Sequence, residues 1–256
     1  MITLDDLAAD VGLDEVQTAG LSCYLDLLLG WRRGNVTAVR SRDEAIERLL
    51  ADSLALLDVR AFGKAGPRWL DLGAGAGIPG IPLAVARPTA QLTLLDSVAR
   101  KCVFLEEAVV AAGLAGRARV VHARSEDFAA REEDADERRS AGAGRAAAPA
   151  DGGREAFDVV FARAVAGLAT VVELAAPLLA TGGVLLAVKT AAGAAAEGSA
   201  AEAVAGRCGL AASGTVALSS SPLRDSVCAV FSKRDPTPDW LPRRAGLAAR
   251  RPLAPL

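Results

Sequence analysis

A run of closely spaced glycines is the strongest candidate for chemistry in this sequence. It reads Asp71-Leu72-Gly73-Ala74-Gly75-Ala76-Gly77-Ile78-Pro79-Gly80. An apolar, strand-like stretch precedes it and a helical pattern follows, and ligands bind at such junctions in open α/β sheets. Glycines there adopt backbone conformations closed to other residues and let the main chain approach a ligand closely. A bare strand-to-helix turn needs fewer glycines, so we expect a ligand-binding loop.

Two kinds of ligand fit this loop. The spacing Gly75-x-Gly77-x-x-Gly80 matches the dinucleotide fingerprint, whereas Gly73-x-Gly75-x-Gly77 fits the nucleoside-binding loop of S-adenosylmethionine enzymes better. Asp96 ends the next strand-like run, where an acidic side chain can accept hydrogen bonds from ribose hydroxyls in either case. The alternative role for Asp96 is capping of the following helix. No P-loop lysine follows the glycines, which excludes a P-loop nucleotidase.

The composition of the 256-residue chain argues against several other chemistries. There is one histidine, His122, so a histidine-built metal site or a Ser-His-Asp triad would depend on that residue alone. The four cysteines form no C-x-x-C pair, and we expect reduced thiols and no metal. The formal net charge is −2, so nucleic-acid binding would need a local basic patch. Neither a membrane span nor a signal peptide is apparent, which predicts a cytoplasmic protein without membrane contact.

Strand-like and helical patterns alternate after about residue 67. The strand-like runs lie at 69–72, 92–96, 120–122, 157–161, 184–188, 215–218 and 227–231. Such alternation is typical of βαβ units, in which helices cover both faces of a parallel sheet. We therefore expect an α/β fold built on a seven-stranded, mostly parallel sheet.

The sequence divides into three predicted parts. Residues 1–60 form an N-terminal helical extension, in which Ser41 and Glu44 make a capping-box signature. The sheet domain covers residues 61–234. Within it, the charged, Ala- and Gly-rich residues 129–155 are predicted to be a disordered surface insertion. The Pro- and Arg-rich residues 235–256 are predicted to be a flexible tail.

The glycine run belongs to a longer set of motifs. These are Asp71–Leu83 with its Gly-Ile-Pro-Gly-Ile-Pro, Leu94–Ser97 followed by Arg100-Lys101, Arg124–Phe128 and Phe161–Ala164. Together they resemble the RsmG (GidB) family of 16S rRNA guanine-N7 methyltransferases, over the stretch from about Trp31 to Lys189. The doubled Gly-Ile-Pro is far more specific than a generic glycine loop.

The resemblance implies a class I, Rossmann-like methyltransferase fold, S-adenosylmethionine as methyl donor and a guanosine of 16S rRNA as acceptor. Ser125 and Glu126 would flank the adenine. Arg163 would lie at the mouth of the site, where its charge could hold the cofactor carboxylate or an RNA phosphate. The predicted cofactor-binding residues are Gly73, Gly75, Gly77, Ile78, Asp96, Ser125, Glu126 and Arg163.

RNA contacts are expected at basic residues near the carboxyl edge of the sheet and on the N-terminal helices. The predicted RNA-binding residues are Arg32, Arg33, Arg42, Arg100, Lys101 and Lys189. The sequence departs from the family where Leu49 replaces the usual histidine before Leu50-x-Asp52-Ser53. Aromatic residues make up only 4% of the chain, so we expect rRNA to be read by its shape and backbone more than by base stacking.

The expected chemistry needs little from the protein's side chains. Guanine N7 carries a lone pair and no proton, so it can attack a sulfonium methyl without a general base. Holding the reactants in line is worth roughly 7–11 kcal/mol. We therefore assign no catalytic residue, and we expect a monomer. Three alternatives stay open: a methyltransferase with a small-molecule acceptor, a nicotinamide-dependent oxidoreductase and a non-enzymatic protein of the same fold.

Overall fold

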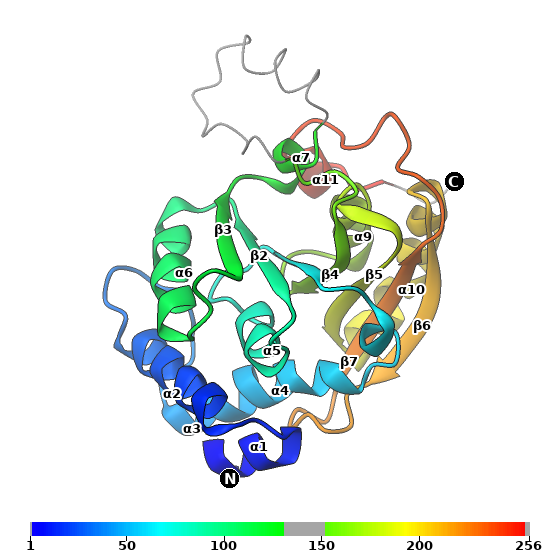
Figure 1. Ribbon diagram of the computed structural model, residues 1–256. Coiled ribbons are helices and arrows are strands. Elements are labelled where there is room, and N and C mark those ends of the chain that lie inside the picture. The colour runs from blue at the N-terminus through cyan, green and yellow to red at the C-terminus, as the bar shows by residue number, and fades with distance from the viewer. Residues whose placement is uncertain (1, 131–151, 254–256) are drawn as a thin grey trace.

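The residues described by the computed structural model, 2–130 and 152–253, contain a seven-stranded sheet (Figure 1). Its order is β3-β2-β1-β4-β5-β7-β6. β7 is antiparallel to β5 and β6, and all other neighbours are parallel. The strands are β1 (Arg68–Leu72), β2 (Gln91–Asp96), β3 (Ala118–His122), β4 (Phe157–Arg163), β5 (Leu179–Thr190), β6 (Leu210–Ala217) and β7 (Ser226–Lys233). The predicted mostly parallel α/β sheet is confirmed.

Two hydrophobic cores lie on opposite faces of this sheet. Successive residues of a strand point to opposite faces, so Trp69 of β1 packs in one core and Leu70 in the other. Likewise Phe161 of β4 belongs to the first core and Val160 to the second. Burial on both faces explains why these strands are nearly continuous apolar runs in the sequence.

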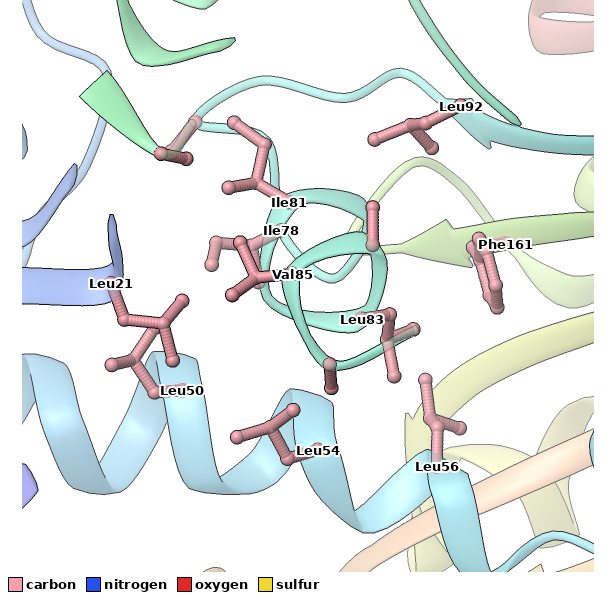
Figure 2. Packing of buried hydrophobic residues seen from close by; sticks show 14 of the residues in the cluster. Leu21, Leu50, Leu54, Leu56, Ile78, Ile81, Leu83, Val85, Leu92 and Phe161 are labelled. Atoms are coloured by element: carbon pink, nitrogen blue, oxygen red, sulfur yellow. The ribbon is translucent and has the colours of Figure 1, made fainter. Parts of the chain in front are cut away.

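The first core is covered by the N-terminal helices and by the helices that follow β1 and β2. They are α1 (Leu4–Val11), α2 (Glu15–Gly30), α3 (Arg42–Ala45), a π-helical turn (Ile46–Ala51), α4 (Asp52–Leu54), short 3₁₀ turns (Ala55–Asp58 and Phe62–Lys64), α5 (Gly80–Ala86) and α6 (Ala99–Ala111). Ser41 Oγ accepts the Glu44 N–H at 3.2 Å and caps α3, but the Glu44 carboxylate accepts the N–H of Arg40 instead of that of Ser41, so half of the predicted capping box is present. Figure 2 shows Leu50 and Leu54 facing α5, so the extension is part of the core.

The second core is covered by helices from the second half of the chain. They are α7 (Ser125–Phe128), α9 (Leu168–Ala175), α10 (Ala191–Arg207) and α11 (Leu247–Arg250). Small residues such as Ala201 and Ala205 are fully buried on α10 and allow close packing on the sheet. Among the helices in the described ranges, none has both the length and the apolar character required to cross a membrane.

The C-terminal segment differs from its prediction. Within residues 235–253, where the sequence predicts a flexible tail, Thr237, Leu241 and Ala248 are buried on the second-core side of the molecule. Leu241 is 2% exposed. Arg243 donates two hydrogen bonds to the carboxylate of Glu173 in α9, at 2.6 and 2.7 Å. The ion pair of Arg243 with Glu173 and the buried side chain of Leu241 thus anchor a segment whose composition predicts disorder.

The predicted insertion at residues 129–155 is only partly described. Residues 131–151 lie outside the described residues. At the two ends, Ala129 and Ala130 are buried, and Gly153 donates a backbone hydrogen bond to the carbonyl of Phe128 at 2.8 Å. The ends of the predicted insertion therefore belong to the packed domain.

Candidate functional site

A cavity of about 300 Å³ opens at the carboxyl edge of the sheet, near the low end of the size range of small-molecule sites. It lies where the loops after β1, β2, β3 and β4 meet, with α11 beside them. The lining residues are Leu72, Gly73, Leu95, Asp96, Ser97, Val98, Lys101, Ala123, Arg124, Ser125, Glu126, Ala164, Val165, Ala166, Thr170, Leu174 and Ala249. Four of the predicted cofactor-binding residues line it: Gly73, Asp96, Ser125 and Glu126.

The three loop glycines have different positions around this cavity. All have positive φ, at 67° for Gly73, 57° for Gly75 and 83° for Gly77, a conformation that favours glycine. Gly73 lines the cavity, and the N–H of Gly75 donates to Asp96. A Cβ at Gly77 would lie 2.4 Å from Cδ1 of Ile81, so this glycine serves close packing of α5. Only the first of the three faces the cavity.

Ile78, predicted to line the cofactor site, does not line this cavity. Its side chain is 9% exposed and belongs to the first hydrophobic core. Figure 2 shows it in the same cluster as Leu50 and Val85. The neighbouring loop is also held from the N-terminal extension, because the hydroxyl of Tyr24 donates to the carbonyl of Ala76 at 2.7 Å. Ile78 therefore holds the glycine loop against the first hydrophobic core.

Asp96 is fixed at the end of β2 with both carboxylate oxygens in use. Oδ2 accepts the N–H of Gly75 and Oδ1 accepts the N–H of Val98, both at 2.9 Å. The side chain of Asp96 is 5% exposed, and Nζ of Lys101 lies 3.9 Å from Oδ2. A carboxylate has about four acceptor positions, so two remain for ligand hydroxyls. Asp96 does not cap α6, since the N-cap residue there is Val98.

Asp71 is buried beneath the glycine loop. Its Oδ2 accepts the N–H of Gly80 at 2.9 Å, while Oδ1 has no hydrogen-bond partner among the described residues. Burial raises the pKa of Asp71 to about 8, and the negative charge of Asp96 acts in the same direction. The opposite charge of Arg163 and the Gly80 hydrogen bond lower it. Asp71 is 1% exposed and is not among the residues that line the cavity, so its carboxyl group contributes by holding the loop at Gly80.

Ser125 and Glu126 open α7 and are both buried at the cavity wall. Oε1 of Glu126 accepts the N–H of Gly246 at 2.6 Å, and the Ser125 hydroxyl lies 3.4 Å from Oε2. Ala249 of α11 lines the cavity next to them. The sequence prediction missed this contribution of the C-terminal segment, because Gly246 lies 120 residues after its partner.

Arg163 was expected at the mouth of the cofactor site, but the structure places it beside the N-terminal extension. It is not among the residues that line the cavity. Its Nη2 pairs with Oδ2 of Asp52 at 2.9 Å and donates to the carbonyl of Arg48 at 2.8 Å. The side chain of Asp52 is 2% exposed, so its buried carboxylate is matched by this cation. Arg163 thereby ties the N-terminal extension to the end of β4.

Lys189 is also paired, contrary to the expectation of a free RNA contact. Its Nζ donates to Oε2 of Glu197 at 2.8 Å and to the carbonyl of Ala166 at 2.9 Å, and its side chain is 18% exposed. The hydrogen bond from Lys189 holds the pKa of Glu197 below its ordinary value. This lysine connects β5, α10 and the loop after β4.

The remaining predicted RNA-binding residues separate into groups. Arg33 lies over the ring of Trp31, 4.1 Å from its centroid, and pairs with Glu107. Arg32 lines a hollow of about 390 Å³ in the loop of residues 28–40, and the side chain of Arg100 lies next to Gly34 of this loop.

The other two predicted RNA contacts lie apart from this loop. Arg42 instead bonds to Asp26 and to Ser22 of α2. Lys101 lines the cavity at the carboxyl edge of the sheet. The structure thus brings Arg32, Arg33 and Arg100 to one loop.

Known proteins of one family match this chain. The model of the family described as rRNA small subunit methyltransferase G matches residues 17–219. Proteins named ribosomal RNA small subunit methyltransferase G are 38% identical over 245 residues in Chloroflexus aggregans and 32% identical over 253 residues in Desulfitobacterium hafniense. These alignments cover 95% and 98% of this chain, and 93% and 95% of the two relatives.

A solved structure supports the fold independently. The apo form of SibL, an S-adenosylmethionine-dependent methyltransferase, is similar with a TM-score of 0.51 at 17% identity, over 72% of this chain and 55% of SibL. This likeness concerns the fold alone, which is that of class I methyltransferases. With the sequence matches over most of its length, the chain belongs to the rRNA small subunit methyltransferase G (GidB) family.

Proposed function

We propose that this protein transfers the methyl group of S-adenosylmethionine to N7 of a guanosine in 16S rRNA. Family membership supports a methyltransferase acting on small-subunit rRNA. The observation that carries the cofactor assignment is the position of Asp96. Its carboxylate is fixed at the cavity wall by two backbone N–H groups, and each oxygen can accept one further hydrogen bond.

The residues around the cavity suit each part of this cofactor. Asp96 would accept hydrogen bonds from the ribose hydroxyls. Ser125 and Glu126 would lie beside the adenine, next to Ala249. Gly73 and Val165 both line the cavity. A Cβ at Gly73 would lie 3.1 Å from Cγ2 of Val165 and would require a strained backbone, so glycine at this position keeps the space between them open for the ligand. The fit supports S-adenosylmethionine in this cavity.

The cofactor supplies a methyl group activated by the sulfonium charge, and this chain's residues supply position. N7 of guanine attacks with its own lone pair, so no side chain has to remove a proton. The role of the cavity is to hold the methyl in line with N7 and to exclude water, which is worth roughly 7–11 kcal/mol. Arg163 is a positioning residue in this scheme, since its pair with Asp52 fixes the N-terminal extension beside the site.

The rRNA substrate would approach over basic loops at the carboxyl edge. Arg32, Arg33 and Arg100 lie around one loop of the extension, and Lys101 lies at the cavity itself. Contacts of this kind attract phosphate without reading bases. Shape and backbone recognition therefore remain our expectation for the RNA.

Transfer of a labelled methyl group tests the acceptor. Labelled S-adenosylmethionine is incubated with 30S subunits that lack the modification, with naked 16S rRNA and with a pool of small molecules. We expect label in 16S rRNA of at least one of the first two samples. Label in the small-molecule pool alone would instead indicate a small-molecule methyltransferase, and no transfer in any sample would indicate a protein that only binds partners.

Calorimetry tests the cofactor separately. We expect S-adenosylmethionine or S-adenosylhomocysteine to bind and NADH not to bind. Tight binding of NADH without either adenosyl compound would overturn the cofactor assignment in favour of an oxidoreductase.

A further inference from the structure

The C-terminal segment forms a hollow that the methyl-transfer scheme does not use. It has a volume of about 370 Å³ and is lined by Arg244, Ala245, Leu247, Arg250 and Arg251. We name it the arginine hollow. It includes residues of α11, which lies beside α7 in Figure 1. These residues lie beyond residue 219, where the match to the family model ends.

The carboxylate of Glu126 reaches the segment that forms the arginine hollow, where it accepts the N–H of Gly246 and does not pair with the arginines of the hollow. Within residues 2–130 and 152–253, no carboxylate lies at ion-pair distance from Arg244, Arg250 or Arg251, all of which are exposed. Arg243 is different, because its guanidinium is matched by Glu173. Three unmatched cations around one concave surface repel each other and favour the binding of an anion.

A fourth arginine connects this hollow with the cofactor cavity. A Cβ at Gly246 would lie 3.3 Å from Nη2 of Arg250 and 3.9 Å from Nη1 of Arg124, so the two guanidinium groups converge on one backbone position. Arg124 also lines the cofactor cavity, as does Ala249 of α11. The arginine hollow is therefore next to the cavity in which we place the methyl donor.

We propose that the arginine hollow binds backbone phosphates of the RNA substrate beside the methylated nucleotide, an inference that rests on the proposed function. A nucleotide that reaches the cofactor cavity brings its neighbouring phosphates to the surrounding surface. Guanidinium groups bind phosphate with two parallel hydrogen bonds. The phosphodiester backbone of RNA presents one phosphate per nucleotide, so it can contact several of these three arginines in succession.

The test compares two variants that each lose three positive charges. Arg244→Gln/Arg250→Gln/Arg251→Gln removes the rim of the hollow. Arg60→Gln/Lys64→Gln/Arg87→Gln is the control, because these exposed cations precede β1 and β2 at the opposite edge of the sheet. Binding to unmodified 16S rRNA is measured by filter retention between about 50 and about 200 mM salt. Affinity for S-adenosylhomocysteine is measured by calorimetry.

For the rim variant we expect RNA binding weakened about tenfold or more and a plot of log K against log salt that is less steep by about 2. The control should match the wild-type protein in both respects, and all three proteins should bind S-adenosylhomocysteine alike. Arg244→Lys/Arg251→Lys, which keeps the charge, should retain the wild-type salt slope.

The remaining outcomes distinguish failure of the arginine hollow as an RNA site from failure of the proposed function. Equal RNA affinity and salt slope in the rim variant and the control would overturn the hollow as an RNA site. This would be the expected outcome if the hollow served an acidic protein partner. If the wild-type protein itself neither bound nor methylated 16S rRNA, the proposed function would fail instead.

Discussion

At the residue scale, Asp96 has the most direct role in the proposed site. Its two oxygens hold the glycine loop and the start of the α6 turn, and they face the cavity with acceptor positions left over. We expect Asp96→Ala to weaken S-adenosylhomocysteine binding about 100-fold or more, since two hydrogen bonds to a charged acceptor are lost at about 1.5–3 kcal/mol each. Calorimetry measures this loss.

Two further variants serve as comparisons, one at Asp96 itself and one at a carboxylate away from the cavity. Asp96→Asn keeps the shape and part of the acceptor capacity, and we expect a smaller loss of about tenfold. Asp58→Ala removes an exposed carboxylate that bonds to Ser220 far from the cavity, and it should bind as the wild-type protein does. Unchanged affinity in a folded Asp96→Ala protein would contradict the assignment of the ribose.

Asp71 gives a prediction about pH. Burial raises its pKa to about 8, while an Asp of the unfolded chain titrates near about 4. Between these values the folded state binds more protons than the unfolded state, so the free energy of unfolding falls as the pH rises and levels off above about pH 8. Asn at position 71 cannot lose a proton. The difference between the Tm of Asp71→Asn and the Tm of the wild-type protein should therefore shift in favour of the variant as the pH is raised from about 5 to about 8.

Thermal unfolding without cofactor at several pH values measures this difference. Asp58→Asn serves as the control because Asp58 is exposed, and its Tm should stay parallel to that of the wild-type protein. A constant difference between Asp71→Asn and wild type across this range would show that Asp71 titrates normally.

Individual site residues were predictable from the sequence to different degrees. Gly73 and Asp96 follow strands directly, so strand order alone brings them to one edge. Arg163 and Lys189 follow strands too, but each is paired with a carboxylate on another element, and no local pattern reveals Asp52 as the partner of Arg163. A charged residue at a strand end was therefore predictable, whereas the carboxylate that pairs with it was not.

At the element scale, the buried pair of Arg163 and Asp52 joins the N-terminal extension to the sheet. We expect Asp52→Ala to lower the free energy of unfolding by about 3–5 kcal/mol, because it leaves a buried guanidinium without its counter-ion. Adding Arg163→Met should recover part of the loss. Urea denaturation of the wild-type protein and of these two variants measures the free energies of unfolding.

An exposed pair on the same helical stretch provides the comparison. Glu44 pairs with Arg48, and their side chains are 35% and 57% exposed. Glu44→Ala should cost less than about 1 kcal/mol. Similar costs for Glu44→Ala and Asp52→Ala would show that the buried pair does not hold the extension in place.

The C-terminal segment shows where reading by composition fails. Residues 235–253 consist mostly of proline, arginine and alanine. They contain few large apolar residues, so their composition does not predict a packed element. The segment is nevertheless anchored by Arg243 on Glu173 and by the N–H of Gly246 on Glu126, partners 70 and 120 residues earlier. Order here comes from specific charged and polar contacts, which hydrophobic periodicity does not detect.

At the scale of the whole molecule, the sheet was the most predictable feature. All seven strand-like runs of the sequence fall within strands or end one residue beyond them. For strands such as β1 and β4, burial on both faces makes the apolar run nearly continuous. Charge is less predictable at this scale. The net charge of −2 conceals basic loops and an arginine hollow that lie around one edge of the sheet.

The central claim is methylation of guanosine N7 in 16S rRNA, and nucleoside analysis of the labelled product tests it most directly. Unmodified 30S subunits and 16S rRNA are incubated with the protein and labelled S-adenosylmethionine, and the RNA is digested and separated. The account predicts that the label is found as 7-methylguanosine, and that Asp96→Ala forms far less of it. Label in a different methylated nucleoside, or no label in rRNA, would contradict the claim.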